Sequence, residues 1–117
     1  KAPAPIGPYS QAVLSGNTLY ISGQIAIDQS TGALVQDSIE AETKQVMINL
    51  GHVLSAAGMD FSNVIKCSIF VKDMGNFQKI NEVYGGYFTE NPPARETVEV
   101  SRLPKDVNVE ISMIACK

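Results

Sequence analysis

The sequence predicts an α+β domain in which two helices cover one face of a mostly antiparallel sheet. The length of 117 residues suits one domain, residues 1–117. Two segments repeat apolar residues at steps of three and four, as helices do, and the other apolar segments alternate as strands do. Hydrophobic residues make up 44% of the chain and charged residues 18%, which is typical of a globular protein rather than a disordered one. The predicted order of elements is β-β-α-β-α-β-β.

The N-terminal part predicts a β-hairpin after a proline-rich arm. Residues 1–8 contain three prolines and cannot begin in a helix or a central strand. The segments 9–14 and 18–25 are predicted strands, and Ser15-Gly16-Asn17 between them has the composition of a hairpin turn. A second turn over residues 28–32 ends this unit.

The clearest helix follows, with its apolar side chains on one stripe. The stripe consists of Ile39, Thr43, Val46, Met47, Leu50, Leu54 and Ala57. Asp37 is expected to cap the first turn, with Glu40 three residues later as in a capping box. Gly58 is expected to end the helix in the left-handed conformation. His52 falls away from the centre of the stripe and is expected on the solvated face.

The middle of the chain predicts a strand and then a shorter helix. In the strand, residues 61–72, four side chains should share one face: Ile65, Cys67, Ile69 and Val71. In the helix, residues 76–88, the apolar stripe consists of Phe77, Ile80, Tyr84 and Phe88. The other face of the strand includes Val64 and Phe70 and is too apolar for water, so we expect an oligomer.

The C-terminal part predicts a second hairpin, with strands over 95–102 and 107–116 and a turn over 103–106. Pairing Val100 with Val109 places five polar side chains on the sheet face away from the helices: Arg95, Thr97, Glu99, Glu110 and Ser112. In this register Arg95 and Glu110 lie about 13 Å apart, at ~3.3 Å per residue. Their side chains would leave room for a small molecule and a water.

Arg95 and Glu110 are therefore the main candidates for a site. A guanidinium group matches a carboxylate in two hydrogen bonds, and a nearby glutamate can hold and deprotonate a water. The pair suits hydrolysis at a carbon next to a carboxylate. The alternative is a salt-bridge network at a subunit interface that joins these two residues with Glu99 and Arg102.

Composition argues against several other classes of protein. The net charge of −3 disfavours nucleic acid and anionic membrane surfaces as partners, and no apolar run reaches the ~18 residues of a membrane helix. Two cysteines, Cys67 and Cys116, and one histidine disfavour a metal centre, a disulfide scaffold or a Ser-His-Asp triad. Cys67 is expected to be a small core residue and Cys116 to be inert, and the unpaired cysteines predict a cytoplasmic protein.

Three further positions are weaker candidates. Tyr9 follows Gly-Pro and could equally be a packing aromatic residue. Ser22-Gly23 interrupts a strand, either at a simple bulge or where a ligand or another chain approaches closely. Asn81 lies in the middle of a predicted helix, where asparagine is unfavourable, and a surface position would also explain it.

Eight short motifs, in order along the chain, resemble the RidA (reactive intermediate deaminase) family, also called YjgF. They are IGPYSQ at 6–11, SGQI at 22–25, VKD at 71–73, NEVY at 81–84, PAR at 93–95, VEV at 98–100, RLPKD at 102–106 and VEI at 109–111. The resemblance covers essentially the whole chain. It implies a chorismate-mutase-like fold assembled as a homotrimer, with the three sheets packed as a central barrel and ligand clefts between subunits.

The resemblance also implies cofactor-independent hydrolysis of 2-imino acids and their enamine tautomers, such as 2-aminoacrylate/2-iminopropanoate and 2-iminobutanoate. The products would be 2-keto acids and ammonia, and pyridoxal-phosphate-dependent dehydratases would supply the substrates. By motif, Arg95 would bind the substrate carboxylate and Glu110 would position the attacking water. The cleft would be lined by Tyr9, Ser22, Gly23, Asn81 and Thr97. No metal, nucleic acid or membrane is implied.

The chain departs from the family at Glu96-Thr97, where members commonly carry Ser-Cys. Thr97 is small and can form hydrogen bonds, so hydrolysis is expected to survive without the thiol. Two other functions stay open: a non-catalytic module that binds 2-keto acids or similar metabolites, and an endoribonuclease or translation inhibitor, names attached to some relatives. The negative net charge weighs against RNA.

Overall fold

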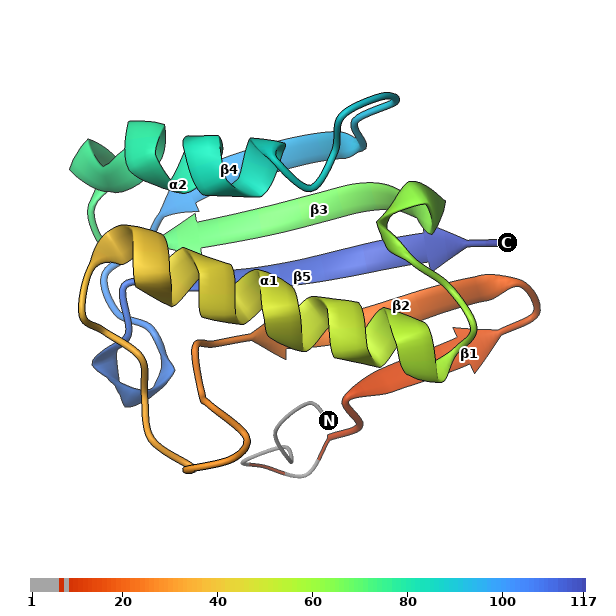
Figure 1. Cartoon of the computed structure of the whole chain (residues 1–117), viewed down its shortest axis with the longest axis horizontal. Coiled ribbons are helices and arrows are strands. Elements are labelled where there is room, and N and C mark those ends of the chain that lie inside the picture. The colour runs from red at the N-terminus through yellow and green to blue at the C-terminus, as the bar shows by residue number, and fades with distance from the viewer. Residues whose placement is uncertain (1–6, 8) are drawn as a thin grey trace.

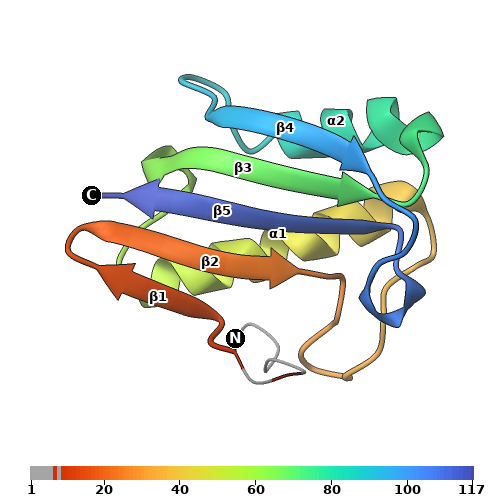
Figure 2. The same ribbon diagram turned by 180° about the vertical axis from the view of Figure 1, so that it is seen from behind.

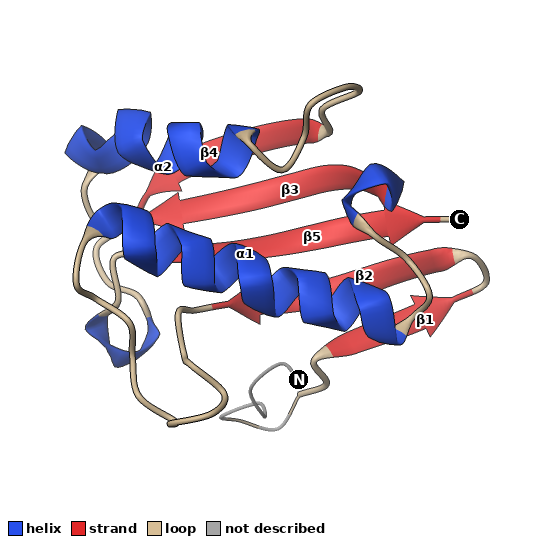
Figure 3. Cartoon of the chain, in the orientation of Figure 1, coloured by secondary structure: helices blue, strands red, loops and turns tan. Residues whose placement is uncertain are grey.

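Five strands form one sheet in the order β1-β2-β5-β3-β4 in the computed structural model, which describes residue 7 and residues 9–117. The elements are β1 (Ala12–Ser15), β2 (Thr18–Gln24), α1 (Ile39–Ala56), β3 (Val64–Val71), α2 (Phe77–Gly85), β4 (Ala94–Glu99) and β5 (Val109–Cys116). Both helices cover the same face of the sheet (Figure 1 and Figure 3). From behind, no helix of the described chain covers the sheet (Figure 2), and we call this side the bare face. The predicted α+β class is confirmed.

The first hairpin forms as predicted. Ser15 pairs with Thr18, so Gly16 and Asn17 make the turn. Gly16 has a φ of 60°, a left-handed conformation that two-residue hairpin turns require. β1 begins at Ala12 rather than at residue 9. The predicted arm falls mostly on residues 1–6 and 8, which lie outside the described part of the chain.

The second predicted hairpin is wrong. β5 pairs antiparallel with β2 and β3. β4 pairs with β3, runs parallel to it, and has no other partner among the described strands. Parallel neighbours need a long crossover connection, and α2 provides it between β3 and β4. The segment 103–106 holds a short 3-10 turn and leads from the edge of the sheet to the start of β5.

This pairing changes the face on which the β4 side chains lie. Arg95 pairs with Cys67 and Thr97 with Ile69, and both β3 partners are buried under the helices. Arg95, Thr97 and Glu99 are therefore on the helix-covered side, and predicting them on the other face was wrong. Glu110 and Ser112 pair with Phe70 and Ser68 and do lie on the bare face, as predicted.

The core lies between the sheet and the helices. From α1, the predicted stripe buries Val46, Met47, Leu50 and Leu54. From the sheet, Cys67, Ile69, Ile111 and Met113 pack against them. Burial of each large apolar side chain contributes about 1.5–3 kcal/mol. The interpretation of Cys67 as a small core residue is confirmed.

Three polar side chains of α1 are also buried, and each is hydrogen-bonded. The Thr43 hydroxyl donates to the Ile39 carbonyl oxygen within the helix at 2.8 Å, and the other two side chains bond outside it. The Glu42 carboxylate accepts the Asn108 backbone N–H and its side-chain amide, both at 2.8 Å. The Asn49 amide donates to the carbonyl oxygens of Ile25 and Ile27. These bonds tie α1 to the segments that enter and leave the sheet.

Smaller differences are local. Ser38 rather than Asp37 caps α1, since its hydroxyl accepts the Ala41 N–H at 3.0 Å. Gly58 has the expected left-handed φ, of 71°. Ile65 is exposed and Val64 is buried in its place, because the pairing of β3 with β5 shifts by one residue there. His52 is half-buried, so its predicted place on the solvated face was only partly right.

Neither α1 nor α2, the two α-helices of the described chain, has the length and apolar character of a membrane span.

Candidate functional site

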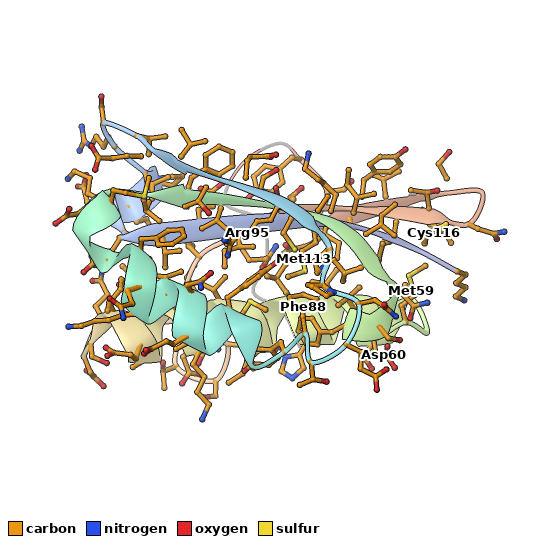
Figure 4. The ribbon with its side chains drawn as sticks, turned by 90° about the horizontal axis from the view of Figure 1, so that it is seen from above. Met59, Asp60, Phe88, Arg95, Met113 and Cys116 are labelled. Atoms are coloured by element: carbon orange, nitrogen blue, oxygen red, sulfur yellow. The ribbon has the colours of Figure 1, made fainter. Side chains whose placement is uncertain are left out.

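Arg95 is held on the helix-covered side of β4 by side chains of α2. Its Nη1 donates a hydrogen bond to Asn81 Oδ1 at 2.5 Å. Its Cζ lies 5.1 Å from the centre of the Tyr84 ring and 5.5 Å from that of Phe77, distances at which a cation is attracted to an aromatic face. Asn81 follows Phe77 by four positions and Tyr84 follows Asn81 by three, so all three side chains share one side of α2. In the edge-on view of Figure 4, Arg95 lies next to α2. We call these four residues the arginine half-site.

The guanidinium forms no ion pair with any carboxylate of the described chain. Arg102 pairs with Asp106 at 2.6 Å, and Glu99 accepts the backbone N–H of Met74. Within the described chain, Arg95 therefore takes part in no salt-bridge network with Glu99, Glu110 or Arg102; a network between copies of the chain stays a prediction. An arginine side chain has five N–H donors, and the described residues use one of them on Arg95. The other donors are available to a ligand.

A cavity of about 300 Å³ opens beside Arg95. It lies between α2 with its C-terminal extension and the loop before β4. Its lining consists of Asn81, Tyr84, Gly85, Phe88, Pro92, Pro93 and Arg95. A positive group at the edge of a cavity whose lining combines apolar and polar surface is suited to a small molecule with one anionic end.

The residues beside Arg95 on the sheet do not supply a reactive group. Burial raises the pKa of the Cys67 thiol to about 11, and the neighbouring Tyr84 hydroxyl and Arg95 guanidinium offset this only in part. Cys67 is therefore protonated at neutral pH and a poor nucleophile. The Thr97 hydroxyl is buried and has no hydrogen-bond partner among the described residues.

Glu110 lies on the bare face of the sheet, where burial raises the pKa of its carboxyl. Ile21 pairs with Met113 and Gln24 with Ile111, so Ser22 and Gly23 together stand opposite a single β5 residue. This is a β-bulge. A Cβ on Gly23 would lie 2.7 Å from the Glu110 Cδ and overlap the carboxylate. The interpretation of a bulge at this glycine is confirmed, and the group that approaches it closely is Glu110 of the same chain; approach by a ligand or another chain stays a prediction.

Ser22 links Glu110 to the segment that carries Tyr9. The Ser22 hydroxyl donates to the Ser10 carbonyl at 2.6 Å, and the Ser22 N–H donates to the Gln11 carbonyl at 2.9 Å. Tyr9 itself is partly exposed. We call Tyr9, Ser22, Gly23 and Glu110 the glutamate half-site.

The structure thus brings the sequence-predicted residues together as two groups rather than one. Asn81, Arg95 and Thr97 are on the helix-covered side, and Ser22 and Glu110 are on the other, with β3 between β4 and β5. A small molecule bound to Arg95 cannot reach Glu110 of the same chain. Sequence reasoning had not connected Phe77 and Tyr84 with Arg95, although their spacing from Asn81 indicates a shared helix face.

The described residues contain no group of three or more His, Cys, Asp or Glu side chains that could hold a metal ion.

The fold and the two half-sites define a small α+β protein that presents an arginine at a cavity and a half-buried glutamate on the opposite sheet face. The whole chain, residues 1–117, matches the family model described as endoribonuclease L-PSP. The chain belongs to this family, the RidA/YjgF family, as its motifs indicated.

Relatives and solved structures agree over nearly the full length. A RutC family protein from Pyrococcus horikoshii is 55% identical over 116 residues, which are 99% of this chain and 92% of the relative. The 2-iminobutanoate/2-iminopropanoate deaminase of Homo sapiens is 49% identical over 115 residues, 98% of this chain and 84% of the relative. The structure of E. coli TdcF with bound serine has a TM-score of 0.94 at 38% identity, covering 99% of this chain and 93% of that one. RidA from Psychrobacter has a TM-score of 0.96 at 41% identity, covering 100% and 94%.

Proposed function

We propose that the protein hydrolyses 2-imino acids and their enamine tautomers to 2-keto acids and ammonia in a cleft formed by two copies of the chain. The observation that carries this proposal is the state of Arg95. Its guanidinium is fixed by Asn81 and two aromatic rings, has no carboxylate partner in the described chain, and borders a cavity. The human relative, 49% identical, is named for this reaction.

The chemistry requires few groups from the protein. Water adds to the carbon of the protonated C=N bond, the C–N bond then breaks, and ammonia leaves as ammonium: R–C(=NH₂⁺)–COO⁻ + H₂O → R–CO–COO⁻ + NH₄⁺. Arg95 binds the carboxylate through two hydrogen bonds. Glu110 accepts a proton from the attacking water and returns it to the departing nitrogen. The carbon is already electrophilic, so orientation and one proton carrier suffice, and these steps need no cofactor.

The proposal requires an assembly, because Arg95 and Glu110 of one chain lie on opposite sides of the sheet. The bare face offers a surface for one: Val13, Tyr20 and Val98 are 54%, 50% and 43% exposed. Exposed apolar patches of this kind commonly mark interfaces. In a homotrimer the bare faces would pack around a common axis, and the glutamate half-site of each copy would meet the arginine half-site of the next.

The substrates would come from other enzymes. Compounds such as 2-aminoacrylate, 2-iminopropanoate and 2-iminobutanoate form when pyridoxal-phosphate-dependent dehydratases act on serine or threonine. We therefore place the protein after such a dehydratase.

The test couples the protein to a serine or threonine dehydratase and measures the rate of 2-keto acid and ammonia formation. Arg95→Ala should lower kcat/KM about a thousandfold, because two hydrogen bonds to a charged group contribute about 4 kcal/mol together. Arg102→Ala is the matched control, since Arg102 is exposed and pairs with Asp106, and it should leave the rate unchanged. An Arg95→Ala variant as fast as the wild type would contradict the proposal.

The description of the family model supports a second candidate, an endoribonuclease. The net charge of −3 weighs against it, because nucleic-acid binding depends on neutralising phosphates with basic residues. Titration of a labelled single-stranded RNA at low and at high salt distinguishes the two. Failure to bind at either salt concentration would exclude the ribonuclease.

A further inference from the structure

We infer that the cavity beside Arg95 receives the side chain of the imino acid, and that Gly85 sets the size of the side chain accepted. This inference rests on the proposed function and deepens it by naming the substrate class. The site is expected to favour 2-imino acids with large apolar side chains over those with a methyl group.

The chemistry of the lining supports an apolar occupant. Arg95 is the one charged residue among the described residues that line the cavity. The Asn81 oxygen already accepts a hydrogen bond from Arg95. The other side chains are two aromatic rings, Tyr84 and Phe88, and two prolines. An apolar substituent would pack on these rings, and Phe88 and the two prolines offer no hydrogen-bond donor to a polar substituent.

The position of the cavity supports the same orientation. The carbon next to the substrate carboxylate is planar, and the attacking water must approach it through one face of that plane. When Arg95 holds the carboxylate, that face must be turned toward Glu110 of the neighbouring copy. The nitrogen and the side chain lie in the plane on opposite sides of the carboxylate axis, and the space between α2 and the loop before β4 offers room for the side chain.

The volume indicates the size class. About 300 Å³ is at the lower end of the range for small-molecule pockets. A methyl or ethyl group would reach little of the lining, whereas a branched aliphatic chain or a phenyl ring is long enough to contact Tyr84 and Phe88. Each additional buried methylene group favours binding of the larger substrate.

Gly85 is the position where the chain leaves this space open. It is the last residue of α2, and a Cβ added there would have no atom within 4 Å. It is not among the glycines with positive φ, so its backbone accepts any L-residue. The next residue, Gly86, is a matched control. A Cβ on Gly86 would lie an ordinary 3.5 Å from the Val83 carbonyl oxygen, and Gly86 is not part of the lining.

The experiment compares the full-length wild type with Gly85→Ala, Gly85→Leu and Gly86→Leu. An L-amino-acid oxidase generates the imines of alanine, leucine and phenylalanine in situ, and kcat/KM is measured for each. The measured quantity is the preference ratio, which is kcat/KM for the leucine or phenylalanine imine divided by kcat/KM for the alanine imine. Gly85→Leu should lower this ratio at least tenfold, because the pocket loses the space of a few methylene groups. Gly85→Ala should lower this ratio less, and Gly86→Leu should not change it.

The outcomes separate the inference from the proposed function. If the wild type hydrolyses these imines but neither Gly85 variant changes the ratio, the inference is wrong. The same holds if Gly86→Leu changes it as much as Gly85→Leu. If the wild type hydrolyses none of the imines, the proposed function itself fails. Circular dichroism checks that each variant is folded, and Gly85→Ala provides the ratio if Gly85→Leu does not fold.

Discussion

The arginine and glutamate half-sites are positioned in opposite ways. Arg95 is oriented by contacts, because Asn81, Phe77 and Tyr84 surround it from one helix. Glu110 is accommodated by the lack of a side chain, because only a glycine at position 23 leaves room for its carboxylate. The first arrangement should weaken gradually as single contacts are removed. The second should be disturbed by the addition of a single methyl group at position 23.

The largest effect is expected in an experiment that asks whether the arginine half-site of one chain meets the glutamate half-site of another. Arg95→Ala and Glu110→Gln chains, each nearly inactive alone, are unfolded, mixed in equal amounts and refolded together. Random assembly places an intact arginine half-site against an intact glutamate half-site at about a quarter of the interfaces. Activity in the dehydratase-coupled assay should therefore rise to about a quarter of the wild-type value. A mixture no more active than its components would mean that both residues act within one chain.

Glu110→Gln separates catalysis from binding. It should lower kcat about a hundredfold, the usual range for loss of a general base. The Kd of a 2-keto acid, measured by calorimetry, should change little, because Arg95 remains. If the variant binds normally and the wild type shows no turnover to lose, the protein is a metabolite-binding module.

Glu110→Gln should also change how kcat and the free energy of unfolding depend on pH. Burial raises the Glu110 pKa above its ordinary value of 4.5. The carboxylate must be ionised to accept a proton, so kcat should fall as pH drops through this raised pKa, and Glu110→Gln should abolish that acidic limb. A raised native pKa also means that the charged form destabilises the folded chain. Glu110→Gln should therefore raise the free energy of unfolding at pH 7, and the gain should disappear below the pKa.

Gly23→Ala should have an intermediate effect, about a tenfold loss in kcat, because the new Cβ displaces the Glu110 carboxylate. Gly86→Ala is the control, as its Cβ meets only ordinary contacts. A crystal structure or a pH–rate profile of Gly23→Ala shows whether the carboxylate has moved. Wild-type kcat in this variant would mean that the room left by Gly23 has no role in catalysis.

The smallest effect is expected for Phe77→Leu, which removes one of the two rings near the Arg95 guanidinium. A cation–π contact at a partly exposed position contributes about 0.5–1 kcal/mol, or a two- to fivefold change. The loss should appear in KM rather than in kcat, because the ring acts on carboxylate binding through Arg95. Met74→Leu, at an exposed position nearby in sequence, is the control.

Local patterns in the sequence predicted the elements but not their neighbours. The turn at Gly16-Asn17, the α1 stripe and the end of α1 at Gly58 depend on residues close in sequence, and all three are confirmed. Alternation correctly placed Arg95 and Thr97 on one face of their strand. It could not show that β3 would lie beside them, because that pairing depends on how α2 packs. The face was therefore misassigned.

The residues of the site came from a different source. Spacing alone supported Arg95 and Glu110 only in a register that the structure does not have. The motifs that resemble the family named both residues independently of any register. What could not be predicted is that each residue lies in a different half-site, because the opposing faces follow from the parallel pairing of β4.

The parallel pairing also leaves β4 at the border of the sheet, with one side of its backbone unmatched by any strand in the described chain. An exposed edge strand of this kind can pair with strands of other chains and so promote aggregation into fibres. Pro92 and Pro93 precede the strand and cannot donate hydrogen bonds to an incoming backbone, and Glu96 and Glu99 add charge along it. The strand that carries Arg95 is thus protected against aggregation by its own composition, and no element of the described chain needs to cover it and close off the cavity.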